Sequence, residues 1–390
     1  MERCDVAIVG AGPVGLLLGC LLVQRGLAVR VLERTRSPRD HSRAIGIHPP
    51  GLACLAEVGA ADAVLAAGVR VRRGLAFGGQ KPLGDISFAH LSGPYPFVLS
   101  APQSRTEQAL ETRLEALAPG VLTRDAEVIA CTPGDGDATL TARGEGTKRV
   151  VRARFVVGCD GKHSLVREAA RIAYPGGAYR RARFVMADVD DDTPFGDDAA
   201  VFLTREGVVE SFPLPGGQRR WVVGLGKHDD HAPDAPPTAA AIERLVALRT
   251  GQLARAESAT MLSAFTAEHH LARKFAEGTL VLAGDAAHVI SPIGGQGMNL
   301  GWLDAKLLTD VLVRALARPS EATRLLGDYG HVRRKAAEAA RRRAELYMGI
   351  GQTLPLPRVR ELLVQALLTP AVAEHSAKVF AMHGLGSRAG

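Results

Sequence analysis

Three glycines and an acidic residue near the N-terminus have the spacing of a dinucleotide-binding loop. Gly10, Gly12 and Gly15 follow the short apolar run 6–9, and a helical stretch then leads to a second apolar run that ends at Glu33. In such a loop the first glycine permits a tight turn, the second lets the backbone approach a pyrophosphate, and the third lets the helix pack on the strand. Glu33 can accept hydrogen bonds from ribose hydroxyls. Because its carboxylate would repel a 2′-phosphate, the loop favours FAD or NAD over NADP.

Two later segments have the same order of strand, turn and polar residue. The run 155–159 is apolar and enters the turn Asp160-Gly161, which is followed by Ser164 and Arg167. The run 279–283 is a second buried strand by composition, and it opens into Gly284-Asp285. A glycine-rich stretch, Pro292-Ile293-Gly294-Gly295-Gln296-Gly297-Met298-Asn299, then precedes an apolar helix expected over 300–316.

With these three segments in this order, the chain resembles the class A, single-component flavoprotein aromatic hydroxylases, which are built like p-hydroxybenzoate hydroxylase. Within that class it is most similar to the polyketide and phenol hydroxylases, through residues 100–107 and the Gly-Gly-Gln-Gly-Met-Asn run. Residues 380–385 resemble the stretch just before the thioredoxin-like C-terminal domain of longer relatives. We expect the chain to lack that domain.

The motifs and the resemblance together imply that FAD is bound non-covalently. Asp285 could accept a hydrogen bond from the ribityl chain, although an Asp at this position is also an ordinary helix N-cap. Backbone N–H groups at the glycine-rich stretch, aided by the helix dipole, could stabilise the anionic end of a reduced flavin. The expected FAD contacts are Gly10, Gly12, Pro13, Val14, Gly15, Glu33, Arg34, Arg43, Gln103, Arg105, Asp160, Arg167, Gly284, Asp285, Pro292, Gly294, Gly295, Gln296, Gly297, Met298 and Asn299.

The resemblance implies that NADPH or NADH reduces the flavin, and that a flavin C(4a)-hydroperoxide then hydroxylates a small aromatic or phenolic substrate. Pro292 and Arg43 are expected near the flavin ring, but the sequence identifies no catalytic acid or base. For Arg43 and Arg105 the alternative is an ordinary surface position. The same scaffold could instead perform epoxidation, Baeyer–Villiger oxidation or dehydrogenation, or bind a ligand without turnover. A halogenase is disfavoured because the chain has no Trp-x-Trp-x-Ile-Pro segment.

The expected fold class is α/β. A discontinuous, Rossmann-like FAD domain is predicted over 1–73, 97–175 and 272–345. A mixed β-sheet substrate domain is predicted over 74–96 and 176–271, because apolar and alternating runs at 184–189, 200–204, 207–214 and 220–224 are separated by turn residues. A helical C-terminal segment, 346–390, completes the division.

Composition excludes several other classes of protein. The 390 residues carry a net charge of +7, but arginines are spread along the chain and no basic run is interleaved with aromatic residues, which argues against nucleic-acid binding. The five cysteines are scattered and contain no Cys-x-x-Cys pair, so neither a disulfide framework nor structural zinc is expected. No apolar run is long enough to span a membrane, and the N-terminus does not resemble a signal peptide. We expect a cytoplasmic monomer or homodimer.

Two further sets of residues have a bearing on function, the histidines and a basic run near the C-terminus. None of the twelve histidines has metal-like spacing; His288 is expected to support the flavin segment, and His270 stands where relatives often have arginine. The basic run 333–343 is predicted to be a solvated face of a helix, and the alternative is an oligomer or anion contact.

Overall fold

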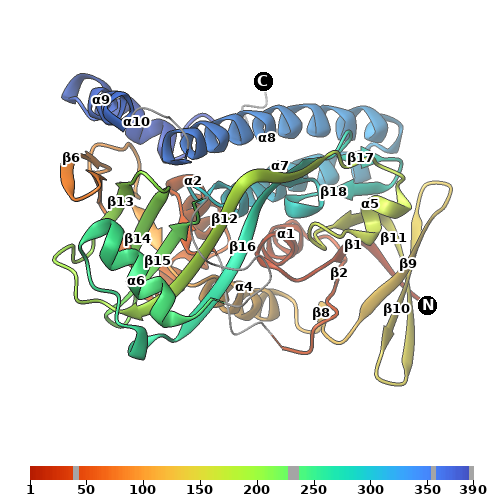
Figure 1. The fold of residues 1–390 in the computed structure, drawn as a ribbon. Coiled ribbons are helices and arrows are strands. Elements are labelled where there is room, and N and C mark those ends of the chain that lie inside the picture. The colour runs from red at the N-terminus through yellow and green to blue at the C-terminus, as the bar shows by residue number, and fades with distance from the viewer. Residues whose placement is uncertain (38–43, 227–236, 353–356, 386–390) are drawn as a thin grey trace.

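The computed structural model describes residues 1–37, 44–226, 237–352 and 357–385, and these residues form a mixed α/β fold. Two eight-stranded sheets stand side by side beneath long helices from the C-terminal half of the chain (Figure 1). The α/β class expected from the sequence is confirmed. The helices are α1 (Pro13–Gln24), α2 (Pro49–Glu57), α3 (Ala61–Ala66), α4 (Gln103–Leu117), α5 (Leu165–Ala169), α6 (Ala239–Thr250), α7 (Gln296–Ala317), α8 (Ala322–Gln352), α9 (Pro357–Leu367) and α10 (Pro370–Phe380).

The first sheet has a parallel centre and an antiparallel flank. Its order is β17-β18-β11-β1-β2-β8, with β10 paired to β11 and β9 paired to β10. Strand β1 runs parallel to both β11 and β2, and β11 runs parallel to β18. The bounds are β1 (Glu2–Val9), β2 (Val29–Leu32), β8 (Leu122–Thr123), β9 (Glu127–Pro133), β10 (Ala138–Gly144), β11 (Thr147–Gly158), β17 (Ala276–Glu277) and β18 (Leu280–Leu282).

The β1-α1-β2 unit forms because its apolar residues are local and almost continuous. Residues 6–9 are buried, and α1 starts with a proline at its first position, where no intrahelical N–H is needed. Residues 15–22 of α1 are all buried. Gly15 permits the close packing of α1 on the loop, because a Cβ there would lie 2.0 Å from the carbonyl oxygen of Gly10.

The second sheet is largely antiparallel, with the order β19-β16-β12-β15-β14-β13-β5-β6. All four strands predicted between 184 and 224 are present, and β12 extends further toward the N-terminus than its apolar run. Strand β5 pairs with β13 in this sheet, and β6 pairs with β5 at its edge; the domain boundaries themselves stay a prediction. The bounds are β5 (Arg73–Gly78), β6 (Lys81–Ser87), β12 (Gly176–Asp190), β13 (Ala199–Leu203), β14 (Val208–Leu214), β15 (Gln218–Gly224), β16 (Met261–Leu271) and β19 (His288–Val289).

The two faces of the second sheet bury different side chains, because successive residues of a strand point to opposite faces. Val185, Trp221 and Val223 belong to a core cluster with residues of α6. Phe184 and Met186 belong to another cluster, which includes residues of α8. One face is therefore closed by α6, and the other faces the rest of the molecule.

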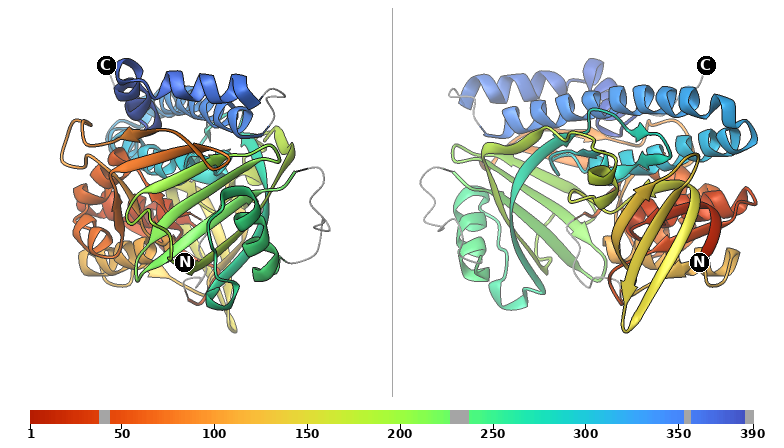
Figure 2. Two further views of the ribbon diagram at one scale, coloured as in Figure 1. Left: turned by 60° about the vertical axis from the view of Figure 1, so that its left-hand side comes forward. Right: turned by 90° about the vertical axis from the view of Figure 1, so that its right-hand side faces the viewer.

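The C-terminal helices cover both sheets (Figure 2). Helix α8 runs along α7, and α10 packs against β6, where the rings of Phe380 and Phe88 are stacked with centroids 5.7 Å apart. The helix expected over 300–316 already begins at Gln296, because Gly295 adopts a left-handed conformation (φ 63°) at its N-cap. A small third sheet joins β3 (Gly46–Ile47), β7 (Val98–Ser100) and β4 (Val69–Val71).

Within the described part of the chain, no helix is both long and apolar enough to cross a membrane. The five cysteines are free.

Candidate active site

One large cavity, with a volume of about 1160 Å³, is lined by residues of both large sheets and of the C-terminal helices. This exceeds the roughly 300–1,000 Å³ of most small-ligand pockets. The cavity therefore has room for an extended ligand together with a smaller one. Fourteen of the expected FAD contacts line it: Gly10, Gly12, Pro13, Val14, Glu33, Arg34, Gln103, Asp160, Asp285, Pro292, Gly294, Gly295, Gly297 and Met298.

Other expected contacts do not line the cavity. Arg105 lies on the exposed side of α4 and bonds to Gln108, one turn further along. Arg167 is buried behind the wall, where its guanidinium donates to the carbonyls of Ala286 and Lys162 and stacks over a tyrosine ring. Arg43 lies outside the described residues. The described contacts that do not line the cavity are Gly15, Arg105, Arg167, Gly284, Gln296 and Asn299.

Glu33 is held in place by the loop that it follows. Its carboxylate accepts hydrogen bonds from the N–H of Ala11 at 2.8 Å and from the N–H and hydroxyl of Thr35, each at 2.9 Å. Burial raises the pKa of Glu33, but these hydrogen bonds outweigh burial and hold the pKa below its usual value. The group is therefore ionised, and its oxygens retain lone pairs for further donors.

Asp160 lies where β1 and β11 end side by side. One carboxylate oxygen accepts from the N–H groups of Leu165 and Val166 at the start of α5, at 2.8 and 3.3 Å. The other oxygen, Oδ1, is buried and has no partner among the described residues. Burial raises the pKa of this carboxyl group. Asp160 thus organises the turn and leaves one acceptor unused at the cavity wall.

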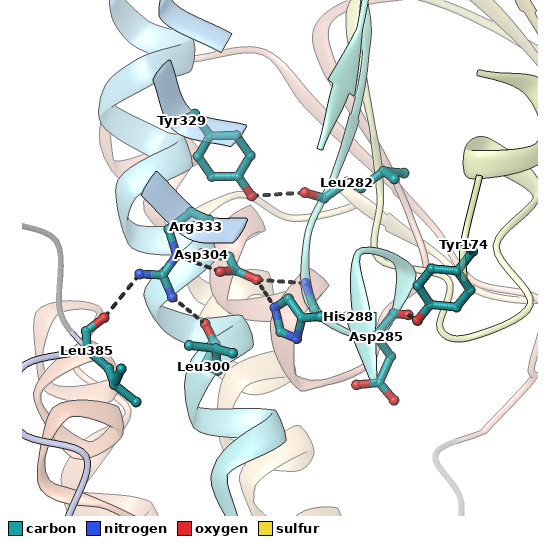
Figure 3. Close-up of polar contacts among 10 residues, drawn as sticks. Tyr174, Leu282, Asp285, His288, Leu300, Asp304, Tyr329, Arg333 and Leu385 are labelled. Carbon is teal, nitrogen blue, oxygen red and sulfur yellow. Dashed lines mark hydrogen bonds and ion pairs between the residues drawn. The ribbon is translucent and has the colours of Figure 1, made fainter. Parts of the chain in front are cut away.

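Asp285 opens into the cavity from the end of β18. Its backbone carbonyl accepts from the hydroxyl of Tyr174 at 2.5 Å, and its carboxylate points away from that bond (Figure 3). Partial loss of solvent at the cavity wall, where the residue keeps an exposed surface, raises the pKa of the carboxyl group.

A buried ionic cluster fixes the backbone next to Asp285 (Figure 3). Asp304 of α7 bonds to His288 Nε2 at 2.6 Å, to Arg333 Nε at 2.6 Å, and to the N–H of Gly284 at 3.1 Å. Arg333 also donates to the carbonyls of Leu300 and Leu385, both at 3.2 Å. Burial raises the pKa of Asp304, but the His288 and Arg333 charges outweigh burial and hold it below the usual value.

This cluster corrects the prediction for the basic helix. Arg333 is fully buried, so the run 333–343 is not simply a solvated face. A periodic charge run shows which residues share a face of a helix, but not which of them meets a buried carboxylate. His288, expected to support the flavin segment, does lie behind the wall and bonds to Asp304.

The glycine-rich stretch is clamped by residues that the sequence did not single out as partners. The Asn299 side chain donates to the carbonyls of Gly46 and Gly295 and accepts from the N–H of His48. His48 Nε2 lies 2.9 Å from the carbonyl oxygen of Gly294. Except for Asn299 and Gly295, the partners are separated by about 250 positions in the chain, so no local signal pairs them.

The half of the cavity formed by the second sheet is mostly apolar. Three charged residues of this sheet line the cavity, Glu210, Arg220 and Glu268. Arg220 makes two bonds to Asp188, at 2.6 and 2.7 Å, and Glu268 accepts from Lys162 at 2.9 Å. The apolar residues from the sheet include Phe184, Met186, Val201, Leu203, Val208, Phe212, Val222 and Phe265, and those from the C-terminal region include Tyr347, Met348, Val364, Leu368 and Phe380.

The fold and this cavity together define a flavin-binding α/β protein, and comparison with known proteins assigns it to a family. Residues 3–344 match the model of a family described as FAD binding domain. The chain is 32% identical over 353 residues to an uncharacterized aromatic compound monooxygenase, YhjG, of Bacillus subtilis (strain 168). It is 33% identical over 311 residues to 6-methylpretetramide 4-monooxygenase of Streptomyces rimosus. The chain belongs to this family of FAD-dependent aromatic monooxygenases.

The matched relatives are longer than this chain. The alignments cover 88% and 77% of the chain, but 68% of YhjG and 54% of the pretetramide enzyme. The crystal structure of p-nitrophenol 4-monooxygenase PnpA from Pseudomonas putida DLL-E4 matches the whole of both chains with a TM-score of 0.89 and 24% identity. At that identity the likeness establishes the fold.

Proposed function

We propose that this protein is a monooxygenase that binds FAD non-covalently and uses NADPH or NADH and dioxygen to hydroxylate a small aromatic or phenolic molecule. The carrying observation is that one cavity joins the dinucleotide loop at Gly10–Val14 to an apolar chamber on the second sheet, with the glycine-rich stretch between them. A single cavity of this kind suits a cofactor whose adenosine end and reactive end are far apart.

The residues present fit FAD. A Cβ on Gly12 would meet no protein atom within 4 Å, so the backbone here can approach a pyrophosphate. The unpartnered Oδ1 of Asp160 and the open carboxylate of Asp285 offer acceptors to the hydroxyl groups of a ribityl chain. Gly297 lies in the first turn of α7, where backbone N–H groups have no intrahelical partner and can face the pyrimidine end of a flavin.

When bound and reduced, FAD supplies the activation of dioxygen. The chain's own residues have three tasks. The first turn of α7 stabilises negative charge at the flavin, Pro292 and Gly294 form the wall beside it, and the apolar sheet residues keep water from the reacting atoms.

The substrate is proposed to be an aromatic molecule of one or several rings. The chamber is lined by three phenylalanines of the second sheet, Phe184, Phe212 and Phe265, and closed by residues of α8 to α10. Such a surface favours flat apolar rings. YhjG of Bacillus subtilis is described as an aromatic compound monooxygenase, which supports the same class here.

The test begins with purified protein loaded with FAD. Phenols should accelerate oxidation of NADPH or NADH, and isotopically labelled dioxygen should place one labelled atom in the organic product. Turnover without incorporated label would replace hydroxylation with dehydrogenation. A label within an expanded ring or an epoxide would assign the other oxygen-transfer reactions. A protein that takes up no FAD would refute the proposal.

A further inference from the structure

Glu210 is an acidic residue in the apolar half of the cavity. It lies on β14 and is only 9% exposed. In the sheet it pairs with Val201 of β13 and Val222 of β15, and both of these residues also line the cavity. Its neighbours on the same face of β14 are Val208 and Phe212. The side chain is therefore surrounded by apolar groups and faces the chamber.

No hydrogen bond or ion pair from the described residues reaches the Glu210 carboxyl group, and loss of solvent alone raises its pKa to about 7. Arg220, the cation on this wall, makes two short bonds to Asp188. Burying an ionisable group without a partner is costly, and such groups are concentrated at functional sites. The missing partner is then a ligand in the cavity.

We propose that Glu210 binds a hydroxyl group of the aromatic substrate and accepts its proton during oxygen transfer. This inference rests on the proposed function. The substrate O–H bond breaks, the proton moves to Glu210, and the electron pair left on oxygen is delocalised into the ring. A ring carbon then forms a bond to one atom of dioxygen as the O–O bond breaks.

The overall reaction balances with NAD(P)H as the reductant. Substrate, dioxygen, NAD(P)H and one proton give hydroxylated product, NAD(P)⁺ and water. The ring hydrogen at the attacked carbon leaves as a proton. Glu210 returns its own proton to product or solvent before the next turnover, so the residue is unchanged over the cycle.

Three other titratable residues that line the cavity, His48, Tyr347 and Glu268, are poor candidates for this role near neutral pH, and Glu268 accepts a hydrogen bond from Lys162 at 2.9 Å. Burial lowers the pKa of His48 to about 4 and raises the pKa of Tyr347 above its usual value. On the sheet, Arg220 and Asp188 are paired with each other. The cavity-lining residues of β13 are apolar.

The test uses the FAD-loaded protein and Glu210→Gln, which keeps the shape and removes the base. The probe is 4-nitrophenol, whose phenol and phenolate forms absorb differently. Near pH 7.5 the wild type should bind it largely as phenolate, and the variant should bind it as neutral phenol. Equal phenolate fractions in the two proteins, or no binding of the probe to the wild type, would overturn the proposal.

Kinetics with a stimulating phenol give a second readout. We expect kcat to fall by about 100-fold or more in Glu210→Gln, in line with loss of a general base. The decline of kcat/KM below about pH 7 should disappear. Glu243→Gln, on α6 at the opposite face of the sheet, is the matched control and should behave as wild type. If no phenol stimulates NAD(P)H oxidation, the proposed function fails, while the absorption test still reports on Glu210.

Discussion

Replacement of Arg333 by methionine tests whether the buried ionic cluster holds the cofactor segment in place. Arg333 and Asp304 are each fully buried and joined at 2.6 Å, so the substitution removes the guanidinium that pairs with this buried carboxylate. Breaking a buried pair in this way costs about 3–5 kcal/mol. The carbonyls of Leu300 and Leu385 also lose a donor. Because typical domains are stable by about 5–15 kcal/mol, the loss should be large.

The assay is urea unfolding followed by circular dichroism, together with FAD titration of the folded variant. Arg342→Met is the matched control, because Arg342 lies on the same helix with its side chain 73% exposed, and it should change stability by less than about 0.5 kcal/mol. FAD affinity should fall in Arg333→Met, because Asp304 also accepts a hydrogen bond from the N–H of Gly284, next to Asp285 in the expected cofactor segment. If the two variants were equally stable, the cluster would have no such role.

Three further outcomes are expected. Glu210→Gln should be more stable than wild type at pH 8. The pKa of Glu210 is about 7 in the folded protein, against an ordinary value of 4.5. At about 1.4 kcal/mol per pKa unit, the stability of the wild type therefore falls by about 3 kcal/mol as the pH rises from 4.5 to 7. Unfolding at pH 5 and pH 8 measures this, and a pH-independent difference between the two proteins would contradict it. Gly15→Ala should lose folded, FAD-binding protein, because the new Cβ would lie 2.0 Å from the carbonyl oxygen of Gly10; a normal melting temperature would be inconsistent with that packing. Glu33→Gln should weaken FAD binding by about tenfold, the effect of roughly one charged hydrogen bond, and unchanged affinity in a fluorescence titration would remove Glu33 from the adenosine site.

Local patterns were sufficient for much of the fold. The run 6–33 encodes a strand, a glycine turn, a helix and a second strand through short-range sterics and continuous apolar composition, and the structure contains all of them. The strands between 184 and 224 were predictable for the same reason. Turn residues and alternation are properties of neighbouring positions, and no distant contact is needed to define them.

Alternation along a strand did not show which face would meet the cavity. Glu210 and Trp221 lie on adjacent strands, yet Glu210 faces the chamber and Trp221 is buried toward α6. The choice depends on which layer covers each face. That is a property of the packed sheet.

The sequence alone determined the α/β class and identified three candidate cofactor segments, because each segment is a short stretch whose glycines and acids have a required spacing. The tertiary structure decided which residues reach the cavity and which stand behind it. Arg167 and Asn299 belong to recognisable motifs but make structural bonds, whereas His48 joins the site through Gly294, 246 positions away. Arg333 is buried because α8 packs along α7 and brings it beside Asp304. Such contacts join distant parts of the chain, and their energies depend on burial that exists only after folding.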